Sequence, residues 1–416
     1  MLWQPSLPEA YHALTPDVLA AAITVRRGQL GDSLVILGHH YQTDDVIRHV
    51  DFTGDSLKLS QIAAKLSTDR PAGRPVKFVI FCGVHFMAET ADMLTDEAVE
   101  VILPDLSAGC SMADMAQYDD TVEAWRSIHA SLGWTGTGAA GRIIPITYVN
   151  SSAAIKAFVG EHGGACCTSS NARSVVTWAL KGGTSPAGVG EEIKVMFLPD
   201  QHLGRNTAHS LGIDVGLQSC VYDPRLARKG EALGGASASQ VAGSRVILWA
   251  GHCSVHKLFR PEHCDSIRAE NAANPAARPT TILVHPECSK EVVDKADLNG
   301  STEFIIQTIR KAEFGSRWAI GTEFHLVTRL AKEAAGRGVE VRILSECQCL
   351  CTTMYRIDEP HLLWVLDNLV GESDGRDKPR TPKVVNSVRV LPKVRELARL
   401  AIDRMLELAA PAKTMD

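Results

Sequence analysis

Three stretches of the chain carry cysteines after a short apolar run. Cys110 lies in Ser-Ala-Gly-Cys-Ser-Met, Cys253 lies in Gly-His-Cys-Ser-Val-His, and Cys347, Cys349 and Cys351 alternate with other residues in a third stretch. Thiolates are the protein ligands of iron–sulfur clusters, and a [4Fe–4S] cluster with only three such ligands keeps one iron open for a substrate atom. An open iron acts as a Lewis acid. The pattern therefore predicts a substrate-binding cluster with one thiol from each stretch.

Two other uses of cysteine compete with this interpretation. The chain has 11 cysteines, and an intracellular cysteine is most often a small buried apolar residue. Zinc is the competing metal, but the chain lacks a pair of Cys-x-x-Cys motifs at the usual spacing. A disulfide framework is not expected in a reducing compartment. We expect the following cysteines to be ordinary buried residues: Cys82, Cys166, Cys167, Cys220, Cys264 and Cys288.

The elements that must position these thiols are predicted to be strands and helices in alternation. Nine short apolar stretches, many of them β-branched, alternate with amphipathic segments of helical length, which is typical of parallel sheets covered by helices on both faces. The stretches fall into three groups of three, which indicates internal triplication. They lie within 33–40, 76–83 and 100–105, within 143–150, 194–200 and 244–251, and within 280–287, 317–323 and 340–346.

The expected fold is therefore α/β, with three similar three-layer αβα domains, short parallel sheets and pseudo-threefold symmetry. Stretches rich in Gly, Thr, Asn, Ala and Pro set the boundaries. We expect a first domain over 1–132, a second over 133–274 and a third over 275–365. The segment 366–416, with a helical pattern from about Leu391 to Leu408, is expected to pack back on the first domain.

Polar residues follow the opening strand of each group. They are His39 to Tyr41, Tyr148 to Ser152, and His285 to Glu287. Open parallel sheets bind ligands at the carboxyl ends of their strands, so these residues are expected to line a ligand site. The closing strand of each group runs into a ligand cysteine instead.

Bulk composition narrows the function further. The 416 residues are 45% hydrophobic and 22% charged, with a net charge of −5. No long Lys/Arg run is present, so neither nucleic acid nor an acidic membrane surface is expected as a partner. The first residues show no basic region followed by an apolar stretch, and no later segment approaches 18 apolar residues. We expect a cytoplasmic protein with small-molecule substrates.

The ordered motifs resemble those of the quinolinate synthase family from about Leu34 to Val370. The matching segments are Gly-His-His-Tyr-Gln (38–42), Gly-Asp-Ser-Leu (54–57), Tyr-Val-Asn-Ser-Ser-Ala (148–153), Pro-Asp-Gln-His-Leu-Gly-Arg (199–205), Gly-His-Cys-Ser-Val-His (251–256), Val-His-Pro-Glu (284–287) and Gly-Thr-Glu (321–323). The resemblance implies a central [4Fe–4S] cluster, one per chain. It also implies condensation of iminoaspartate with dihydroxyacetone phosphate to quinolinate, with loss of phosphate and water, in de novo NAD biosynthesis.

The resemblance also carries over individual residues. Cys110 and Cys253 match the first two cluster ligands, and counting back from Met354 in a Cys-x-x-Met pattern gives Cys351 as the third, with Cys349 as its rival. Thr352 departs from the proline that often follows this ligand, and His40 departs from the usual Tyr or Asn. The positions implied around the substrates and product are His39, Tyr41, Ser56, Tyr148, Asn150, Ser169, His285, Glu287 and Thr302.

The expected chemistry needs proton transfer at neutral pH. We expect Glu287 to be the principal general base, His285 to orient it or relay protons, and Tyr41 to polarise the triose oxygen or act as an acid. Ser56, Ser169 and Thr302 lie in turns that open helices, where backbone N–H groups favour anions, although each could simply cap its helix. His202 and Glu323 match family motifs and are expected to be secondary or structural.

Two other functions remain open at the level of sequence. The first is another [4Fe–4S] hydro-lyase, which would use the same open iron on a single substrate. The second is a metal or redox sensor, which the weak charge and the absence of a helix-turn-helix pattern disfavour. Functional coupling to an L-aspartate oxidase, as the source of iminoaspartate, is expected from the pathway.

Overall fold

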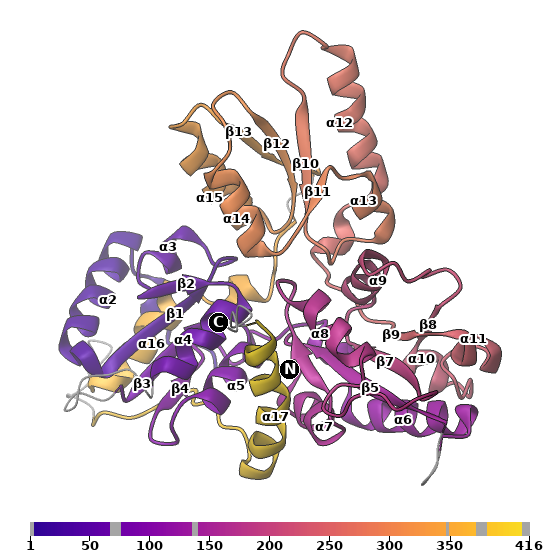
Figure 1. Cartoon of the computed structure of the whole chain (residues 1–416). Coiled ribbons are helices and arrows are strands. Elements are labelled where there is room, and N and C mark those ends of the chain that lie inside the picture. The colour runs from indigo at the N-terminus through magenta and orange to yellow at the C-terminus, as the bar shows by residue number, and fades with distance from the viewer. Residues whose placement is uncertain (1–3, 67–75, 135–139, 347–348, 372–380, 410–416) are drawn as a thin grey trace, which may run out of the picture. The chain divides into compact units, whose positions relative to one another are not determined.

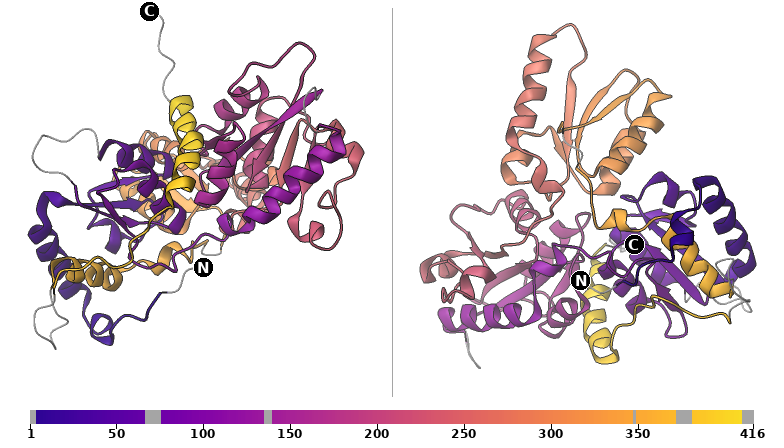
Figure 2. Two further views of the ribbon diagram at one scale, coloured as in Figure 1. Left: turned by 90° about the horizontal axis from the view of Figure 1, so that it is seen from below. Right: turned by 180° about the vertical axis from the view of Figure 1, so that it is seen from behind.

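The computed structural model describes residues 4–66, 76–134, 140–346, 349–371 and 381–409 (Figure 1). Its strands form three separate sheets, and within each sheet the neighbouring strands run parallel. Helices flank the sheets, as Figures 1 and 2 show. The expected α/β class, with three similar units that each have a parallel sheet between helices, is thereby confirmed.

The first sheet has the strand order β2-β1-β3-β4. All six residues of β1 are buried, and β3 is buried at every position after its first. Burial of consecutive residues means that both faces of the sheet are covered, which explains why the sequence shows continuous apolar runs here rather than alternation. The strands are β1 (Leu34–His39), β2 (Phe52–Gly54), β3 (Phe78–Cys82) and β4 (Glu100–Ile102).

The other two sheets repeat this order. The third sheet runs β11-β10-β12-β13, and the second runs β6-β5-β7-β9 with β8 added at its edge. In each sheet the opening strand is therefore central, and the strand that follows it along the chain pairs on its outer side. The strands are β5 (Gly141–Tyr148), β6 (Ala165–Cys167), β7 (Glu192–Leu198), β8 (Ser219–Tyr222), β9 (Val246–Trp249), β10 (Thr280–Val284), β11 (Leu298–Asn299), β12 (Arg317–Gly321) and β13 (Glu340–Ile343).

All nine expected strands are present, and the repeated order confirms the triplication. The sequence missed β2, β6, β8 and β11, each of two to four residues. Such short strands give no usable periodicity, and every one of them lies at the edge of its sheet.

Helices connect and cover these strands. Their ranges are α1 (Glu9–His12), α2 (Pro16–Leu30), α3 (Asp44–Ile47), α4 (Ser56–Leu66), α5 (His85–Leu94), α6 (Tyr118–Leu132), α7 (Ala153–Glu161), α8 (Ala172–Leu180), α9 (Gln201–Ser210), α10 (Pro224–Ala227), α11 (Ala238–Gly243), α12 (Pro261–Ala273), α13 (Lys290–Lys295), α14 (Thr302–Arg310), α15 (Phe324–Ala335), α16 (Glu359–Val370) and α17 (Pro392–Ala409).

The chain forms two compact units. The first spans residues up to 110 with 323–329 and 350–391, and the second spans 111–322 and 330–349 with the C-terminal residues from 392. The first sheet belongs to the first unit, and the second and third sheets share the second unit. The three domain boundaries expected from the sequence stay a prediction.

Two helices at the predicted domain boundaries have partners in the second unit. α6 contacts α7 and α11. α17 contacts α7, α8 and β6 (Figure 1), and its predicted packing on the first domain stays a prediction. Gly160 of α7 explains the close fit of α17, because a Cβ there would lie 2.0 Å from the carbonyl oxygen of Leu397. Only glycine allows the two helices to approach this closely.

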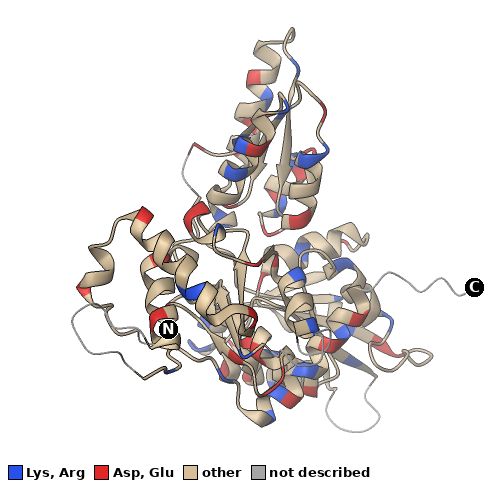
Figure 3. Cartoon of the chain, turned by 90° about the vertical axis from the view of Figure 1, so that its left-hand side faces the viewer, with Lys and Arg blue, Asp and Glu red and all other residues tan. Residues whose placement is uncertain are grey.

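Charged residues of both signs are interspersed along the elements (Figure 3). This distribution agrees with the small net charge of −5. Within the described ranges, no helix combines the length and the apolar character that crossing a membrane requires.

Candidate active site

The strand ends of the second unit bring several expected site residues together. Tyr148 is the last residue of β5, His285 follows β10, and Ser169 lies two residues after β6. Glu287 lies two residues beyond His285, and its carboxyl group is buried. These positions are the carboxyl ends of parallel strands, where ligand sites of open α/β sheets form.

A buried hydrogen-bond chain runs through Glu287, His256 and Thr322. The Nδ1 atom of His256 lies 2.9 Å from Oε2 of Glu287, and its Nε2 atom lies 3.1 Å from Oγ1 of Thr322. Because an ionised carboxylate can only accept, Nδ1 of His256 carries the hydrogen and donates to Glu287. In the tautomer that carries no hydrogen on Nε2, this atom accepts from the hydroxyl of Thr322.

The protonation of Glu287 follows from its neighbours. Burial alone raises the pKa of its carboxyl group, but His256, His285 and the hydrogen bonds from His256 and Tyr148 outweigh burial and lower the pKa to about 2. Glu287 is therefore ionised at neutral pH. Its charge in turn adds to the effect of burial on the nearby Asp200, whose pKa is raised.

His285 is held by contacts on both of its nitrogens. The backbone N–H of Glu287 donates to Nδ1 of His285 (3.3 Å), and Nε2 lies 3.2 Å from the hydroxyl of Ser169. In the neutral ring, Nε2 therefore carries the hydrogen that reaches Ser169. The ring stacks on that of His256 with centroids 4.4 Å apart. This stacking brings both imidazoles to the same carboxylate.

Asn150 offers a group that no described residue satisfies. Its amide oxygen is buried, and it has no hydrogen-bond partner within the described part of the chain. Buried polar atoms are nearly always paired, so an orphaned amide oxygen at a strand end marks a place for a ligand.

The hydroxyl residues expected at helix starts follow three equivalent strands, β2, β6 and β11. Ser56 and Thr302 are each the first residue of their helix, and the residue before them provides the cap: Asp55 accepts from Lys58 N–H, and Ser301 accepts from Phe304 N–H. The alternative that these two hydroxyls cap their own helices is therefore excluded.

His39 and Tyr41 lie together in the first unit. His39 ends β1, and its Nδ1 atom accepts from the backbone N–H of Tyr41 (3.2 Å). The two rings meet edge to face with centroids 4.6 Å apart. The neighbouring His40 is buried. His39 thus holds the ring of Tyr41 at the end of the opening strand.

The cysteines divide into two groups by exposure. Among the ten described cysteines, seven are buried, and the three that are partly exposed are Cys110, Cys253 and Cys351. These three follow β4, β9 and β13, the closing strands of the three sheets. Cys349 is completely buried, with its sulfur 3.2 Å from the hydroxyl of Ser345. Cys347 lies outside the described residues.

The donor set therefore fits an iron–sulfur cluster. Three accessible thiols at equivalent positions are the soft ligands that such a cluster takes. One of them, Cys253, also offers its sulfur within 4.8 Å of a ring nitrogen of His256 and a carboxylate oxygen of Glu287. Sulfur, nitrogen and oxygen donors at this separation are also able to hold a single divalent ion.

Sequence reasoning missed His256, Thr322 and Asp200 as parts of this arrangement. All three lie inside or beside quoted motifs, namely Gly-His-Cys-Ser-Val-His, Gly-Thr-Glu and Pro-Asp-Gln-His. The Cys-x-x-His spacing of Cys253 and His256 was the available signal, because it is a common spacing of metal ligands. For Thr322 the only signal was its place inside the Gly-Thr-Glu motif.

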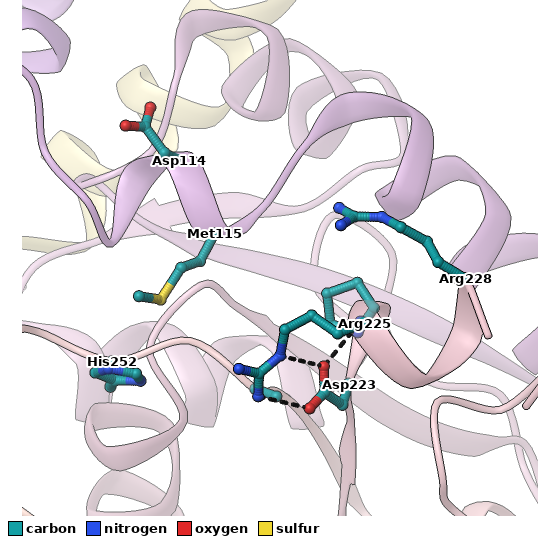
Figure 4. A pocket seen from close by; sticks show the side chains of 8 residues that line it. Asp114, Met115, Asp223, Arg225, Arg228 and His252 are labelled. Carbon is teal, nitrogen blue, oxygen red and sulfur yellow. Dashed lines mark hydrogen bonds and ion pairs between the residues drawn. The ribbon is translucent and has the colours of Figure 1, made fainter. Parts of the chain in front are cut away.

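A pocket of about 230 Å³ in the second unit has His252 in its lining (Figure 4). It contains none of the expected site residues. Arg225 is paired with Asp223 in this pocket, and Arg228 is paired with Asp120. Its lining consists of Asp114, Met115, Asp223, Pro224, Arg225, Arg228, Ala250 and His252.

Fold and site together define a class: an α/β protein of repeated αβα units that carries partly exposed cysteines and buried titratable side chains after its strands. The comparisons with known proteins agree. Residues 23–407 match the family model described as quinolinate synthetase A protein. The chain is 48% identical to the quinolinate synthase of Acidobacterium capsulatum, over 97% of this chain and 94% of that protein.

Two further relatives are the quinolinate synthases of Rhodopirellula baltica, 46% identical over 95% of this chain and 92% of that protein, and of Nocardioides sp., 47% identical over 92% of this chain and 87% of that protein. The chain belongs to the quinolinate synthetase A protein family. It is therefore an enzyme, and the resemblance inferred from its motifs is confirmed.

Proposed function

We propose that the protein is a quinolinate synthase, a transferase of de novo NAD biosynthesis. It condenses iminoaspartate with dihydroxyacetone phosphate and releases phosphate and water. Iminoaspartate and dihydroxyacetone phosphate together have the composition of quinolinate plus phosphate and water, so the overall reaction needs no electron acceptor. The observation that carries this proposal beyond family membership is the exposure of Cys110, Cys253 and Cys351 at three equivalent strand ends, while the other described cysteines are buried.

Cys110, Cys253 and Cys351 would hold the [4Fe–4S] cluster, one per chain. When bound, the cluster supplies an open iron that acts as a Lewis acid toward a substrate oxygen or nitrogen. The burial of Cys349 supports Cys351 as the third ligand.

Glu287 is the proposed acceptor of substrate protons. A carboxylate with a low pKa is a weak base by itself. His256 keeps this carboxylate ionised and oriented, because its Nδ1–H donates to Glu287 and lowers the pKa of the carboxyl group, while Thr322 holds the other side of the ring. His285 and Ser169 form a second proton path beside the same carboxylate. Tyr41 would polarise the triose oxygen.

The substrate carboxylates and the phosphate need donors and positive potential. Asn150 and Tyr148 follow or end β5 beside the proton-transfer groups, and the amide of Asn150 would orient a carboxylate. The imidazole of His39 would likewise donate a hydrogen bond to a substrate carboxylate. Ser56, Ser169 and Thr302 each stand near a helix N-terminus, where free N–H groups favour anions.

The proposal is tested with protein purified without oxygen. It should be brown and contain about four irons per chain. Incubation with iminoaspartate and dihydroxyacetone phosphate should give a pyridine dicarboxylate, identified by chromatography and mass. Cys110→Ser should lose both iron and product, and Cys264→Ser, which changes a buried thiol, should keep both. Brown protein that forms no product would point to a different hydro-lyase.

A single divalent cation is the one alternative that a specific observation favours, because Cys253, His256 and Glu287 are close enough to bind one. Metal analysis separates the two cases. Zinc at one per chain, retained in Cys110→Ser and lost in Cys253→Ser, would replace the cluster in this proposal.

The proposed substrates and cluster also indicate a functional partner and a cellular location. Iminoaspartate is unstable in water, so a supplying L-aspartate oxidase is the expected functional partner. A cytoplasmic location suits a cluster that oxygen and an oxidising compartment would damage.

A further inference from the structure

Asp200 has two different tasks at the start of α9. The residue is completely buried. Its Oδ1 atom accepts the backbone N–H of Leu203 at 2.7 Å, which is the usual bond of a helix cap. Its Oδ2 atom accepts the backbone N–H of Cys253 at 3.1 Å. A cap needs only one oxygen, so the second oxygen is available to fix the cysteine.

The backbone brings the cysteine loop to this carboxylate. Gly251 lies so close to the β7–α9 turn that a Cβ would stand 2.2 Å from the carbonyl oxygen of Pro199. Gly251 pairs with Asp200 in a parallel bridge, and its carbonyl oxygen accepts the N–H of Gln201 at 3.0 Å. The loop that carries Cys253 is therefore joined to the turn by main-chain bonds and by the Asp200 side chain.

The third sheet repeats this arrangement. Glu323 follows β12, the strand equivalent to β7, and its Oε2 atom accepts the N–H groups of His325 (2.8 Å) and Leu326 (3.2 Å) at the start of α15. The backbone N–H of Cys351 interacts with the same carboxyl group. The Oε1 atom of Glu323 is buried and has no hydrogen-bond partner among the described residues. The Oε2 atom caps the helix, and the carboxyl group as a whole lies close enough to the Cys351 amide for the two to interact.

In the first sheet, a main-chain hydrogen bond joins the cysteine loop to the start of the helix that follows β3. The equivalent turn after β3 contains Gly83 and Val84. Here the backbone N–H of His85 donates to the carbonyl oxygen of Ala108 at 2.8 Å. This bond joins the start of α5 to the loop two residues before Cys110. A carboxylate that both caps a helix and interacts with the cysteine amide is therefore observed for the second and third cysteine loops.

We propose that Asp200 and Glu323 are positioning residues for the cluster ligands Cys253 and Cys351. This inference rests on the proposed cluster. Each carboxyl group fixes the orientation of the peptide group of its cysteine. It thereby fixes the direction in which the Cα–Cβ bond points the sulfur. Each also occupies the cysteine N–H, which is then not free to donate to a cluster sulfur. Hydrogen bonds to sulfur raise the reduction potential of iron–sulfur clusters, so these carboxylates keep the potential low and suit a cluster that exchanges no net electrons.

The test uses Asp200→Asn, which preserves shape but leaves one accepting oxygen for two donors. The variant should fold, because that oxygen can still cap α9. It should lose iron to a chelator about tenfold faster than the wild type, as expected for the loss of one buried hydrogen bond. The midpoint potential, from a spectroelectrochemical titration of the visible absorption, should shift to more positive values. Glu323→Gln should behave in the same direction.

Asp358→Asn is the matched control. Asp358 caps α16 by accepting the N–H of His361 at 2.9 Å, and it has no ligand cysteine beside it in the sequence. Its chelation rate and potential should equal those of the wild type. If Asp200→Asn also equals the wild type in both readouts, the positioning role is refuted. If Asp200→Asn does not fold, the same two readouts on Glu323→Gln decide. Wild-type protein without iron would instead refute the proposed function.

Discussion

Replacement of Glu287 by glutamine tests the proposed proton-transfer chain most directly. The carboxylate accepts from Nδ1 of His256 at 2.9 Å and from the phenol of Tyr148. Glutamine has nearly the same shape but only one accepting oxygen, and its amide N–H₂ group can only donate. One of the two buried donors must then face another donor.

The size of the effect follows from this loss. A hydrogen bond to a charged group contributes about 1.5–3 kcal/mol to stability. We therefore expect the free energy of unfolding of Glu287→Gln to fall by about 2 kcal/mol. In the reaction, loss of a positioned general base lowers the rate by about 10²–10⁴. The fall in kcat should therefore be at least about a hundredfold, and it should exceed what the loss of stability explains.

The assay is quinolinate formation under anaerobic conditions, with iron content measured on the same samples. Iron should be unchanged, since Glu287 is not among the proposed cluster ligands. Glu291→Gln, a nearby exposed carboxylate on α13, should have wild-type kcat. If kcat of Glu287→Gln stays within about threefold of the wild type, a shift of well under 1 kcal/mol in the barrier, Glu287 is not the base.

Stability against pH provides an independent check on the charge of Glu287. Its pKa in the folded state is about 2, below the value of about 4.3 in an unfolded chain. A group with a lowered pKa stabilises the fold above its unfolded pKa, and this contribution is lost as pH falls toward the folded pKa. The stability difference between wild type and Glu287→Gln should therefore be constant above about pH 5 and shrink below about pH 4.

Three further outcomes are expected. Cys351→Ser should lose most of its iron and Cys349→Ser should retain it, as measured after identical reconstitution. Gly160→Ala should lower the denaturation midpoint by an amount equivalent to about 1–3 kcal/mol, because its methyl group would collide with the Leu397 carbonyl. Burial lowers the pKa of His202 to about 4, so stability should fall between about pH 6.5 and pH 4, and His202→Gln should flatten that part of the urea-denaturation profile.

The main strands of the fold could be predicted because each is a run of consecutive buried residues. β1 and β9 are buried throughout, so their sequences are apolar without interruption and are bounded by polar turns. β11 has two residues, both exposed. Its strand conformation comes from pairing with β10 and not from its own sequence, which is why no local pattern predicted it.

Helix partners were harder to predict than helices. The range of α17 was close to the observed one, because its apolar residues recur at helical spacing. Its contact with α7 depends on the absence of a side chain at Gly160 and on bonds from Arg404 to the carbonyl oxygens of Gly160 and Gly164. These contacts join positions more than two hundred residues apart. Nothing in the pattern of α17 itself selects that surface.

The candidate site could be predicted one strand at a time, but its connections could not. Tyr148, His285 and Glu287 were found because each stands at the end of a recognisable strand. His256 and Thr322 entered only with the structure, because their role depends on a hydrogen-bond chain through loops after β9, β10 and β12. A single imidazole in a motif gives no indication of which carboxylate it will meet.

Residues at equivalent positions of the three repeats are alike after the closing strands and different after the opening strands. At the closing strands the three repeats keep the same residue type, Cys110, Cys253 and Cys351, as three ligands of one cluster would require. At the opening strands the repeats differ, as the proposed unsymmetrical pair of substrates would require. Those residues are His39 with Tyr41, Tyr148 with Asn150, and His285 with Glu287.

The three loops that carry Cys110, Cys253 and Cys351 differ in the groups that hold them. In the proposed arrangement, Asp200 and Glu323 hold the second and third loops, and a main-chain bond from His85 to Ala108 joins the first loop to α5. Loss of iron in Asp200→Asn without loss of folding would show that the role of Asp200 is metal binding and not the capping of a helix.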